Sequence, residues 1–265
     1  MNLPWYVYLM LAITAISYFF IKILPFLKKA KQVIQSKDYN KNPAGGNLTT
    51  EQKQAISIGA VLAEQNSLFI DSLETALIQS EVDVKKGLNE WWGIFDKNSA
   101  VETMDRLKNS GHRQYYTTVL DLVLNHPKST WDATIQRNYG DNEQALGFVY
   151  NLADTIKGLK GPESYNNISD EDFERGIDAW DMGRLVYLAR MSYHLKFINE
   201  NETWFYINAA HQRSKEAYNS WKEFGKAYVI GRAMWGGNNM GLDGIKHIVD
   251  DLQKDEDSPW HGLDW

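Results

Sequence analysis

The sequence predicts an all-α protein, in which an N-terminal transmembrane helix and a linker precede a single globular multi-helix domain built around a buried central helix. Three observations support this prediction. An uncharged apolar segment lies near the start, apolar residues recur at helical spacing through the rest, and residues 174–197 are apolar on nearly every side. Because a helix that is apolar all round is normally enclosed by other helices, residues 174–197 should form the centre of the domain.

Composition limits the classes of function. The chain has 265 residues, of which 13% are aromatic and 10 are Trp, so it can bury a substantial core. Its net charge of -6 argues against a general nucleic-acid binder, which needs a basic face to neutralise phosphates. Because cysteine is absent, a disulfide framework, a thiolate metal site and a cysteine nucleophile are excluded.

Residues 4–27 are predicted to form the transmembrane helix. No residue from Leu3 to Ile21 is charged, and the apolar run is long enough to cross about 30 Å of hydrocarbon. The alternative is a cleaved signal peptide, which needs a basic region before the apolar run and a small-residue cleavage site after it. Residues 1–4 contain no Lys or Arg, and Pro25 begins a poor cleavage site, so the sequence favours an anchor.

Basic residues predict the orientation of this helix. Lysines follow the span and none precedes it, and positive flanks remain in the cytoplasm. We therefore expect a single-pass protein of the bacterial inner membrane, with its N-terminus outside and its globular domain cytoplasmic. The same lysines could instead bind lipid head groups. They belong to a basic and polar linker over residues 28–47 and are Lys28, Lys29, Lys31, Lys37 and Lys41.

The globular domain is expected to extend from residue 48 to residue 265, because no second linker is visible. Apolar periodicity and capping residues predict its helices, with Thr49, Ser169 and Ser220 as N-terminal caps and Gly111 and Pro127 as helix ends. We found no convincing strand and no internal repeat. The predicted helices are 50–68, 70–79, 84–92, 100–110, 113–125, 143–160, 174–197, 202–218, 221–235 and 242–254.

Charged residues on the apolar helices are the candidate functional site. Helical spacing places Asp181 and Arg184 on the same stripe as aliphatic residues, so both should point inward. A buried charge must be paired, and one interpretation is an ion-pair network in which Asp181 pairs with Arg184 or Arg232. Asp96, Glu102, Glu202 and backbone carbonyls are the other expected partners.

The alternative interpretation is that the surplus arginines bind an anionic ligand, such as a carboxylate or phosphate, between tryptophan side chains. The candidate ligand-binding residues are Asp181, Arg184, Arg190, Arg232, Trp180, Trp221 and Trp235.

Signatures of catalysis and metal binding are absent from the sequence. The six histidines do not have the spacing of a zinc motif, and phosphate-binding glycine loops and nucleophile elbows are missing. No catalytic residue, metal site or cofactor is therefore predicted. The C-terminal tail, with Trp260, His261 and Trp265, is expected to pack back on the domain; the alternative is that it anchors a partner.

Several short motifs carry a resemblance to a known family. Ala179-Trp-Asp-Met-Gly-Arg184, Leu188-Ala-Arg190, Ser220-Trp-Lys-Glu-Phe224 and Gly231-Arg-Ala-Met-Trp235 follow Trp92-Gly-Ile-Phe-Asp96 and Gly111-His-Arg113. Over residues 85–237 this pattern resembles the bacterial family catalogued as domain of unknown function 1266. Since that family has no assigned activity, the resemblance assigns no role to any residue.

These observations predict a membrane-tethered, cytoplasmic helical interaction module that is not catalytic and that recruits or inhibits an unknown protein partner. The alternative is a small anionic ligand-binding protein, or an enzyme, that uses the Arg/Asp/Trp pocket. An enzyme would need an acid, base or nucleophile close to the arginines. His194 lies ten residues beyond Arg184 along the same helix, which weakens that case.

Overall fold

A computed structural model of the chain describes residues 39–45, 47–76, 80–161 and 167–265. All the regular secondary structure of these residues is helical, so the predicted all-α class is confirmed for the part of the chain that the structure describes. The predicted transmembrane helix and residues 28–38 of the linker lie outside the described residues. Within the described ranges, no helix has both the length and the apolar character needed to cross a membrane.

The folded unit begins at Tyr39. The Asn40 carbonyl accepts a hydrogen bond from the Ile70 amide at 2.8 Å, and the Asn42 amide donates to the Asp71 carboxylate at 2.9 Å. The described end of the predicted linker is therefore packed on the segment around Ile70 and belongs to the domain.

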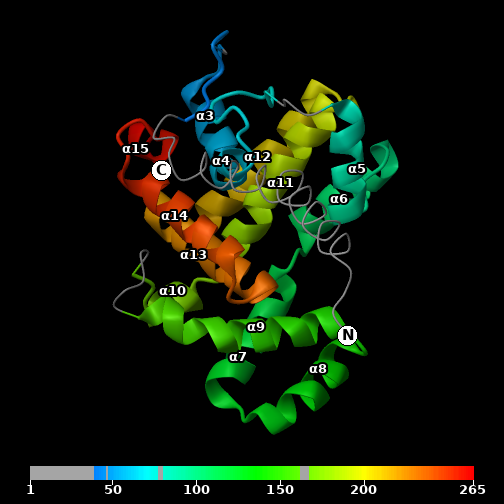
Figure 1. Cartoon of the computed structure of the whole chain (residues 1–265), viewed down its shortest axis with the longest axis vertical. Helices are drawn as coiled ribbons and strands as arrows, with labels where there is room; N and C mark the ends of the chain where they lie inside the picture. The colour runs from blue at the N-terminus through cyan, green and yellow to red at the C-terminus, as the bar shows by residue number, and fades with distance from the viewer. Residues whose placement is uncertain (1–38, 46, 77–79, 162–166) are drawn as a thin grey trace, which may run out of the picture. The chain divides into compact units, whose positions relative to one another are not determined.

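Helix α11, Asp178–His194, lies at the centre of this unit, and only three of its residues escape full burial (Figure 1). It packs against α4 (Ala60–Gln65), α6 (Lys97–Asn109), α12 (Glu200–Ala217) and α13 (Trp221–Gly236). The predicted helix 174–197 is shorter at both ends, because Glu174 belongs to the separate helix α10 (Asp170–Glu174) and α11 ends before residues 195–197. The Tyr218 hydroxyl then accepts a hydrogen bond from the Ala179 amide at 3.0 Å, in the first turn of α11.

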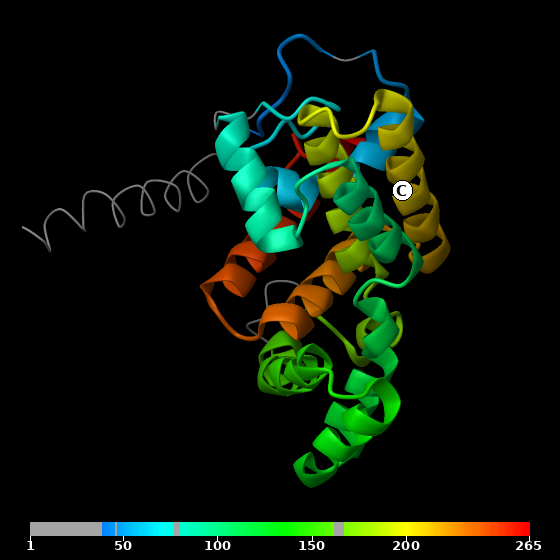
Figure 2. The same ribbon diagram turned by 90° about the vertical axis from the view of Figure 1, so that its right-hand side faces the viewer.

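Helices α7 (Arg113–Asn125), α8 (Trp131–Tyr139) and α9 (Glu143–Lys160) lie together at one end of the domain, in green in Figures 1 and 2. α9 packs on both α7 and α13. The sequence did not indicate α8 or the short 3-10 turn Lys128–Thr130 before it. Buried Trp131 holds this segment against α7, because its indole donates to the carbonyls of Leu122 and His126, both at 3.1 Å.

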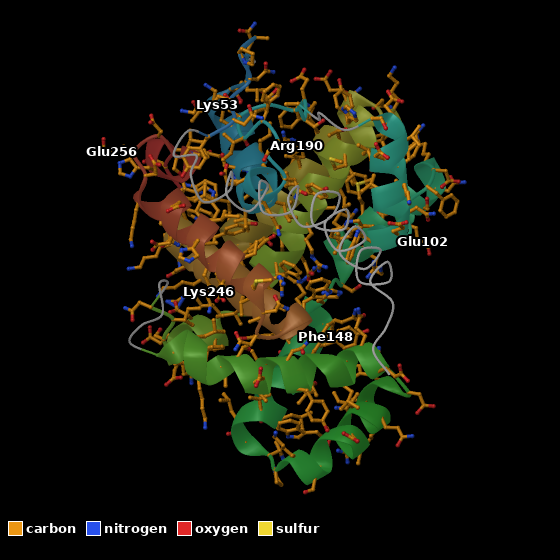
Figure 3. All side chains as sticks on the ribbon, viewed as in Figure 1. Lys53, Glu102, Phe148, Arg190, Lys246 and Glu256 are labelled. Atoms are coloured by element: carbon orange, nitrogen blue, oxygen red, sulfur yellow. The ribbon has the colours of Figure 1, made fainter. Side chains whose placement is uncertain are left out.

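At the opposite end, the predicted helix 50–68 is divided into α3 (Thr50–Ser57) and α4, and Thr49 begins α3 with a capping box. The prediction of a helix over 70–79 is wrong for the described residues 70–76, which have no regular structure. The Arg190 guanidinium, on the part of α11 far from α9 (Figure 3), donates to the Phe69 carbonyl at 2.6 Å and the Glu74 carbonyl at 2.8 Å. This arginine therefore holds the segment as a loop.

The remaining helices are α5 (Glu81–Trp92), α14 (Met240–Lys254) and α15 (Pro259–Gly262). The tail packs back on the domain. Trp260 stacks on Trp221 with ring centroids 5.4 Å apart, and its indole donates to the Ser57 carbonyl at 2.9 Å. The Trp265 indole donates to the Tyr218 carbonyl at 2.8 Å, so the tail joins α3 to the connection between α12 and α13.

Candidate functional site

A cavity of about 520 Å³ opens beside the central helix. Among the described residues its lining includes three arginines and no Asp or Glu, so this cavity, the arginine pocket, carries positive charge. Buried residues form its inner end, whereas exposed residues of α4, α5, α6 and α9 contribute to its rim. The lining residues are Leu62, Gln65, Asn66, Trp91, Trp92, Arg106, His112, Gln144, Trp180, Arg184, Tyr187, Arg232 and Trp235.

Asp181 is fully buried behind the pocket, where it caps the start of α7. Its carboxylate accepts hydrogen bonds from the amides of His112 and Arg113, both at 3.0 Å. It also forms ion pairs with Arg184 and, at 3.1 Å, with Arg113. The expected pair with Arg184 is therefore present, whereas Arg113 is a partner that the sequence did not indicate.

Gly111 gives Asp181 access to these amides. Its φ is +55°, a conformation that favours glycine, and a Cβ atom at this position would overlap the Asp181 carboxylate. The sequence Gly111-His112-Arg113 thus combines a tight turn, the two capped amides and a guanidinium partner. The role of this segment in binding Asp181 depends on its packing against α11, so the sequence alone does not indicate it.

Arg184 lies between two indole rings. Its guanidinium carbon is 4.4 Å from the centroid of Trp180 and 5.8 Å from that of Trp92, and its Nε donates to the Trp180 carbonyl at 3.1 Å. Burial lowers the pKa of Arg184, an effect that the Asp181 carboxylate opposes. The described hydrogen bonds of Arg184 use Nε and Nη2, and the residue lines the pocket.

Arg232 is buried without a carboxylate partner among the described residues. Its Nη2 donates to the Asn239 side chain at 3.0 Å, but its buried Nη1 has no acceptor. The guanidinium packs 5.0 Å from the Trp235 ring centroid and against Gly236, where a Cβ would overlap Nη1. Burial lowers the pKa of Arg232 because the charged form loses its hydration.

His112 is held as a neutral donor. Its Nδ1 accepts a hydrogen bond from the Trp180 indole at 3.2 Å, and this assignment places the ring proton on Nε2. Burial, together with the positive charges of Arg184 and Arg106, lowers the pKa of His112 to about 2. The imidazole therefore remains uncharged at neutral pH.

Two predicted site residues lie elsewhere. Arg190 does not line the pocket but holds the loop at residues 69–74, and burial lowers its pKa to about 10. Trp221 belongs to the C-terminal aromatic cluster with Trp260 and Trp265. The structure brings together Trp180, Asp181, Arg184, Arg232 and Trp235, with Asp181 behind the wall rather than in it.

The other expected ion-pair partners also lie elsewhere. Asp96 caps α6 through the Ser99 amide, and Glu202 pairs with Lys97 at 2.6 Å. The described ion pairs do not include Glu102.

Several lining residues gave no functional signal in the sequence. Arg106 and Gln144 resemble ordinary exposed positions on α6 and α9, and His112 was one of six scattered histidines. The adjacent pair Trp91-Trp92 was the available signal, because tryptophans at a helix end rarely remain exposed without a contact surface. In the part of the chain that the structure describes, no cluster of His, Asp or Glu could hold a metal ion.

Comparison with known proteins identifies relatives rather than an activity. "Uncharacterized protein YbeR" of Escherichia coli (strain K12) is 24% identical over 148 residues, and "Uncharacterized protein YbeU" of the same strain is 26% identical over 151 residues. Each alignment covers 56% of this chain and 56% of the relative, so the match spans little more than half the length of either protein. No solved structure matches the chain.

The family model for "Protein of unknown function (DUF1266)" matches residues 87–265. This range contains every lining residue of the arginine pocket except Leu62, Gln65 and Asn66, and it also contains the Asp181 network. Because the match covers more than half of the chain and agrees with the motifs around Trp180, Arg184 and Arg232, the protein belongs to the DUF1266 family.

Proposed function

We propose that this domain binds a small anionic ligand in the arginine pocket. The observation that carries the proposal is the charge of the pocket: Arg106, Arg184 and Arg232 line it, no described carboxylate does, and Arg232 is buried without a carboxylate partner among the described residues. A buried charge without a partner costs several kcal/mol. An anion in the pocket would provide a partner for the charge of Arg232 and would also lie beside Arg184.

The titratable groups of the pocket favour binding over acid–base catalysis. A general acid or base works best with a pKa near the operating pH. Burial lowers the pKa of His112 to about 2 and raises that of Tyr187 to about 12. Neither residue would exchange a proton readily near neutral pH. The arginines keep their charge, as a permanent anion-binding site requires.

Thermal unfolding of the full chain in phosphate, sulfate and chloride at matched ionic strength tests this proposal. Ligands that bind the folded state raise Tm by mass action, so phosphate or sulfate should raise Tm in a saturable manner relative to chloride. The variant Arg232→Gln should lose most of this increase. Arg137→Gln, an exposed position on α8, should retain it. Equal responses of the two variants, or no response of the parent protein, would contradict anion binding in this pocket.

Recruitment of another protein is the second candidate function. Three large apolar side chains on α5 or just after it are exposed, namely Val82 (74%), Trp91 (76%) and Phe95 (64%). Exposed apolar side chains of this size often belong to contact surfaces. Affinity capture with the full chain should recover a protein that is lost on Phe95→Ser but retained on Arg232→Gln. If the partner protein is recovered with both variants, the exposed side chains of this surface no longer support the recruitment function.

We also propose that residues 4–27 tether the domain to the cytoplasmic face of the bacterial inner membrane. The support is the uncharged apolar segment and the lysines that follow it. A reporter fused after Trp265 should behave as cytoplasmic and should sediment with membranes. A periplasmic reporter, or one that is soluble after cell lysis, would contradict the orientation or the tether.

A further inference from the structure

We infer that the arginine pocket takes a phosphate monoester with a planar aromatic ring, the ligand class to which mononucleotides belong. This inference rests on the proposed function, since it assigns a chemical class to the anion that binds there. It follows from the different chemistry of the two ends of the pocket.

The inner end offers hydrogen-bond donors from three separate elements. They are the guanidinium groups of Arg184 on α11 and Arg232 on α13, and Nε2 of His112 at the start of α7. Among the described residues, the carboxylate beside them is that of Asp181, which is engaged by α7, Arg113 and Arg184. A group that fits here must accept hydrogen bonds without donating any, and the positive charge of the arginines favours an ionised anion over a neutral acceptor.

The arrangement of these donors favours phosphate over carboxylate. A carboxylate is matched best by the two parallel N–H groups of one arginine, in a bidentate pair. Here each arginine already uses one nitrogen for Asp181 or Asn239, and the donors come from different helices. The three terminal oxygens of a phosphate monoester can accept from three directions at once. The charge also fits, because Arg106, Arg184 and Arg232 line the pocket and no carboxylate of the described residues does.

The outer end offers flat apolar surfaces. Trp91 is 76% exposed and Trp235 is 38% exposed at the rim, and the Trp92 ring lines the pocket 5.8 Å from the Arg184 guanidinium. Planar rings of a ligand stack favourably on such indole faces. The side-chain amides of Gln65, Asn66 and Gln144 also line the pocket, and each combines a donor with an acceptor that could bind the polar edge of a ring.

The size of the pocket is consistent with a ligand that has both parts. A volume of about 520 Å³ lies within the range of small-molecule sites, roughly 300–1,000 Å³. Inorganic phosphate alone would satisfy the inner donors but would leave the exposed indole faces uncovered. A neutral ring would cover the indoles but would leave the charge of Arg232 without an anionic partner.

Calorimetric titration of the full chain with adenosine monophosphate, inorganic phosphate, adenosine and benzoate tests the inference. We expect adenosine monophosphate to bind at least about ten-fold more tightly than inorganic phosphate, because stacking adds to the contacts of the phosphate. Adenosine and benzoate should each bind more weakly than adenosine monophosphate by about the same factor or more.

Two variants test the outer and the inner end of the pocket separately. Trp91→Ala removes an exposed side chain and should weaken adenosine monophosphate about five-fold or more without changing inorganic phosphate. Phe95→Ala, a neighbouring exposed aromatic residue that does not line the pocket, is the matched control and should change neither. Arg232→Gln should weaken both ligands about ten-fold or more.

The outcomes distinguish this inference from the proposed function. If inorganic phosphate binds and depends on Arg232, but the adenosine group or Trp91 adds nothing, the aromatic part of the inference is overturned while anion binding stands. Benzoate that binds more tightly than adenosine monophosphate would overturn the phosphate part alone. If none of the anions binds, both the inference and the proposed function fail.

Discussion

Asp181 serves two structural purposes with one carboxylate. It caps α7 by accepting the amides of His112 and Arg113, and it neutralises the guanidinium groups of Arg184 and Arg113. Its contacts use both carboxylate oxygens. The ion pair with Asp181 therefore fixes the position of Arg184 in the pocket wall. This pair uses Nη2 rather than Nη1, so a buried acid can support an anion site.

Replacement of Asp181 by Ala should lower the free energy of unfolding by about 3–5 kcal/mol, because two guanidinium groups and two buried amides lose their acceptor. Urea denaturation measures this change. Asp154→Ala, an exposed aspartate on α9, is the control and should change the stability by about 0.5 kcal/mol or less. An Asp181→Ala protein as stable as its parent would show that the network contributes nothing to the fold.

His112 should make stability depend on pH in a defined direction. Its pKa is lowered to about 2 in the folded state, so the unfolded chain binds a proton first as the pH falls below about 6.5. The stabilisation is therefore fully present above pH 6.5 and is lost progressively down to about pH 2, by about 1.4 kcal/mol for each pH unit.

The variant His112→Gln isolates this contribution. Between pH 6.5 and pH 4.5 the parent protein should lose about 2 kcal/mol more unfolding free energy than the variant, whereas the two should respond alike between pH 7 and pH 8. Denaturant titrations across this pH range measure both slopes. Parallel curves at acidic pH would mean that the imidazole is not buried as a neutral group.

At the scale of the helices, the sequence predicted most elements but not their breaks. The bounds of α7 and α9 agree with the prediction, because each has local end signals and a regular apolar stripe. The loop at residues 69–74 was not predictable, since its carbonyls are bound by Arg190, more than a hundred residues away. The sequence also did not indicate α8, whose buried Trp131 is held by the Leu122 carbonyl of α7, a contact that apolar periodicity does not show.

The turn before α7 provides a test at this scale. Gly111→Ala should lower the unfolding free energy by about 2 kcal/mol or more, because it strains a left-handed backbone and overlaps the Asp181 carboxylate. Gly147→Ala, within α9 and with open space around it, should instead be neutral or stabilise by up to about 1 kcal/mol. Thermal or urea denaturation of the two variants measures both changes. Equal changes in stability would show that the turn at Gly111 has no special requirement for glycine.

At the scale of the domain, the candidate site combines residues from Leu62 to Trp235, which belong to α4, α5, α6, α9, α11 and α13 and the start of α7. Helical phase alone indicated that Asp181, Arg184 and Arg232 point inward. It could not show which of them share a space, because that depends on how α11 crosses α6 and α13. Arg190 has the same apolar sequence surroundings as Arg184, yet it lies against the loop rather than the pocket.

The C-terminal tail connects distant parts of the domain. Trp260 is buried, stacks on Trp221 of α13 and donates to Ser57 at the end of α3. Trp265 binds the Tyr218 carbonyl, and the Tyr218 hydroxyl in turn accepts from the Ala179 amide at the start of α11. The first helix of the domain, the central helix and the tail are thus joined by direct contacts.

Replacement of Trp260 by Ala should therefore weaken the whole domain rather than free the tail alone. Truncation of a buried Trp costs about 3–5 kcal/mol, which corresponds to a decrease in Tm of roughly 6–20 °C for a domain of this size. The decrease should be the same when unfolding is followed by far-ultraviolet circular dichroism and by tryptophan fluorescence, because one cooperative unit unfolds. His261→Ala, an exposed neighbour, should leave Tm unchanged. Two separate transitions in the Trp260→Ala protein would instead show that the tail and α3 form a unit that unfolds independently of the central helix.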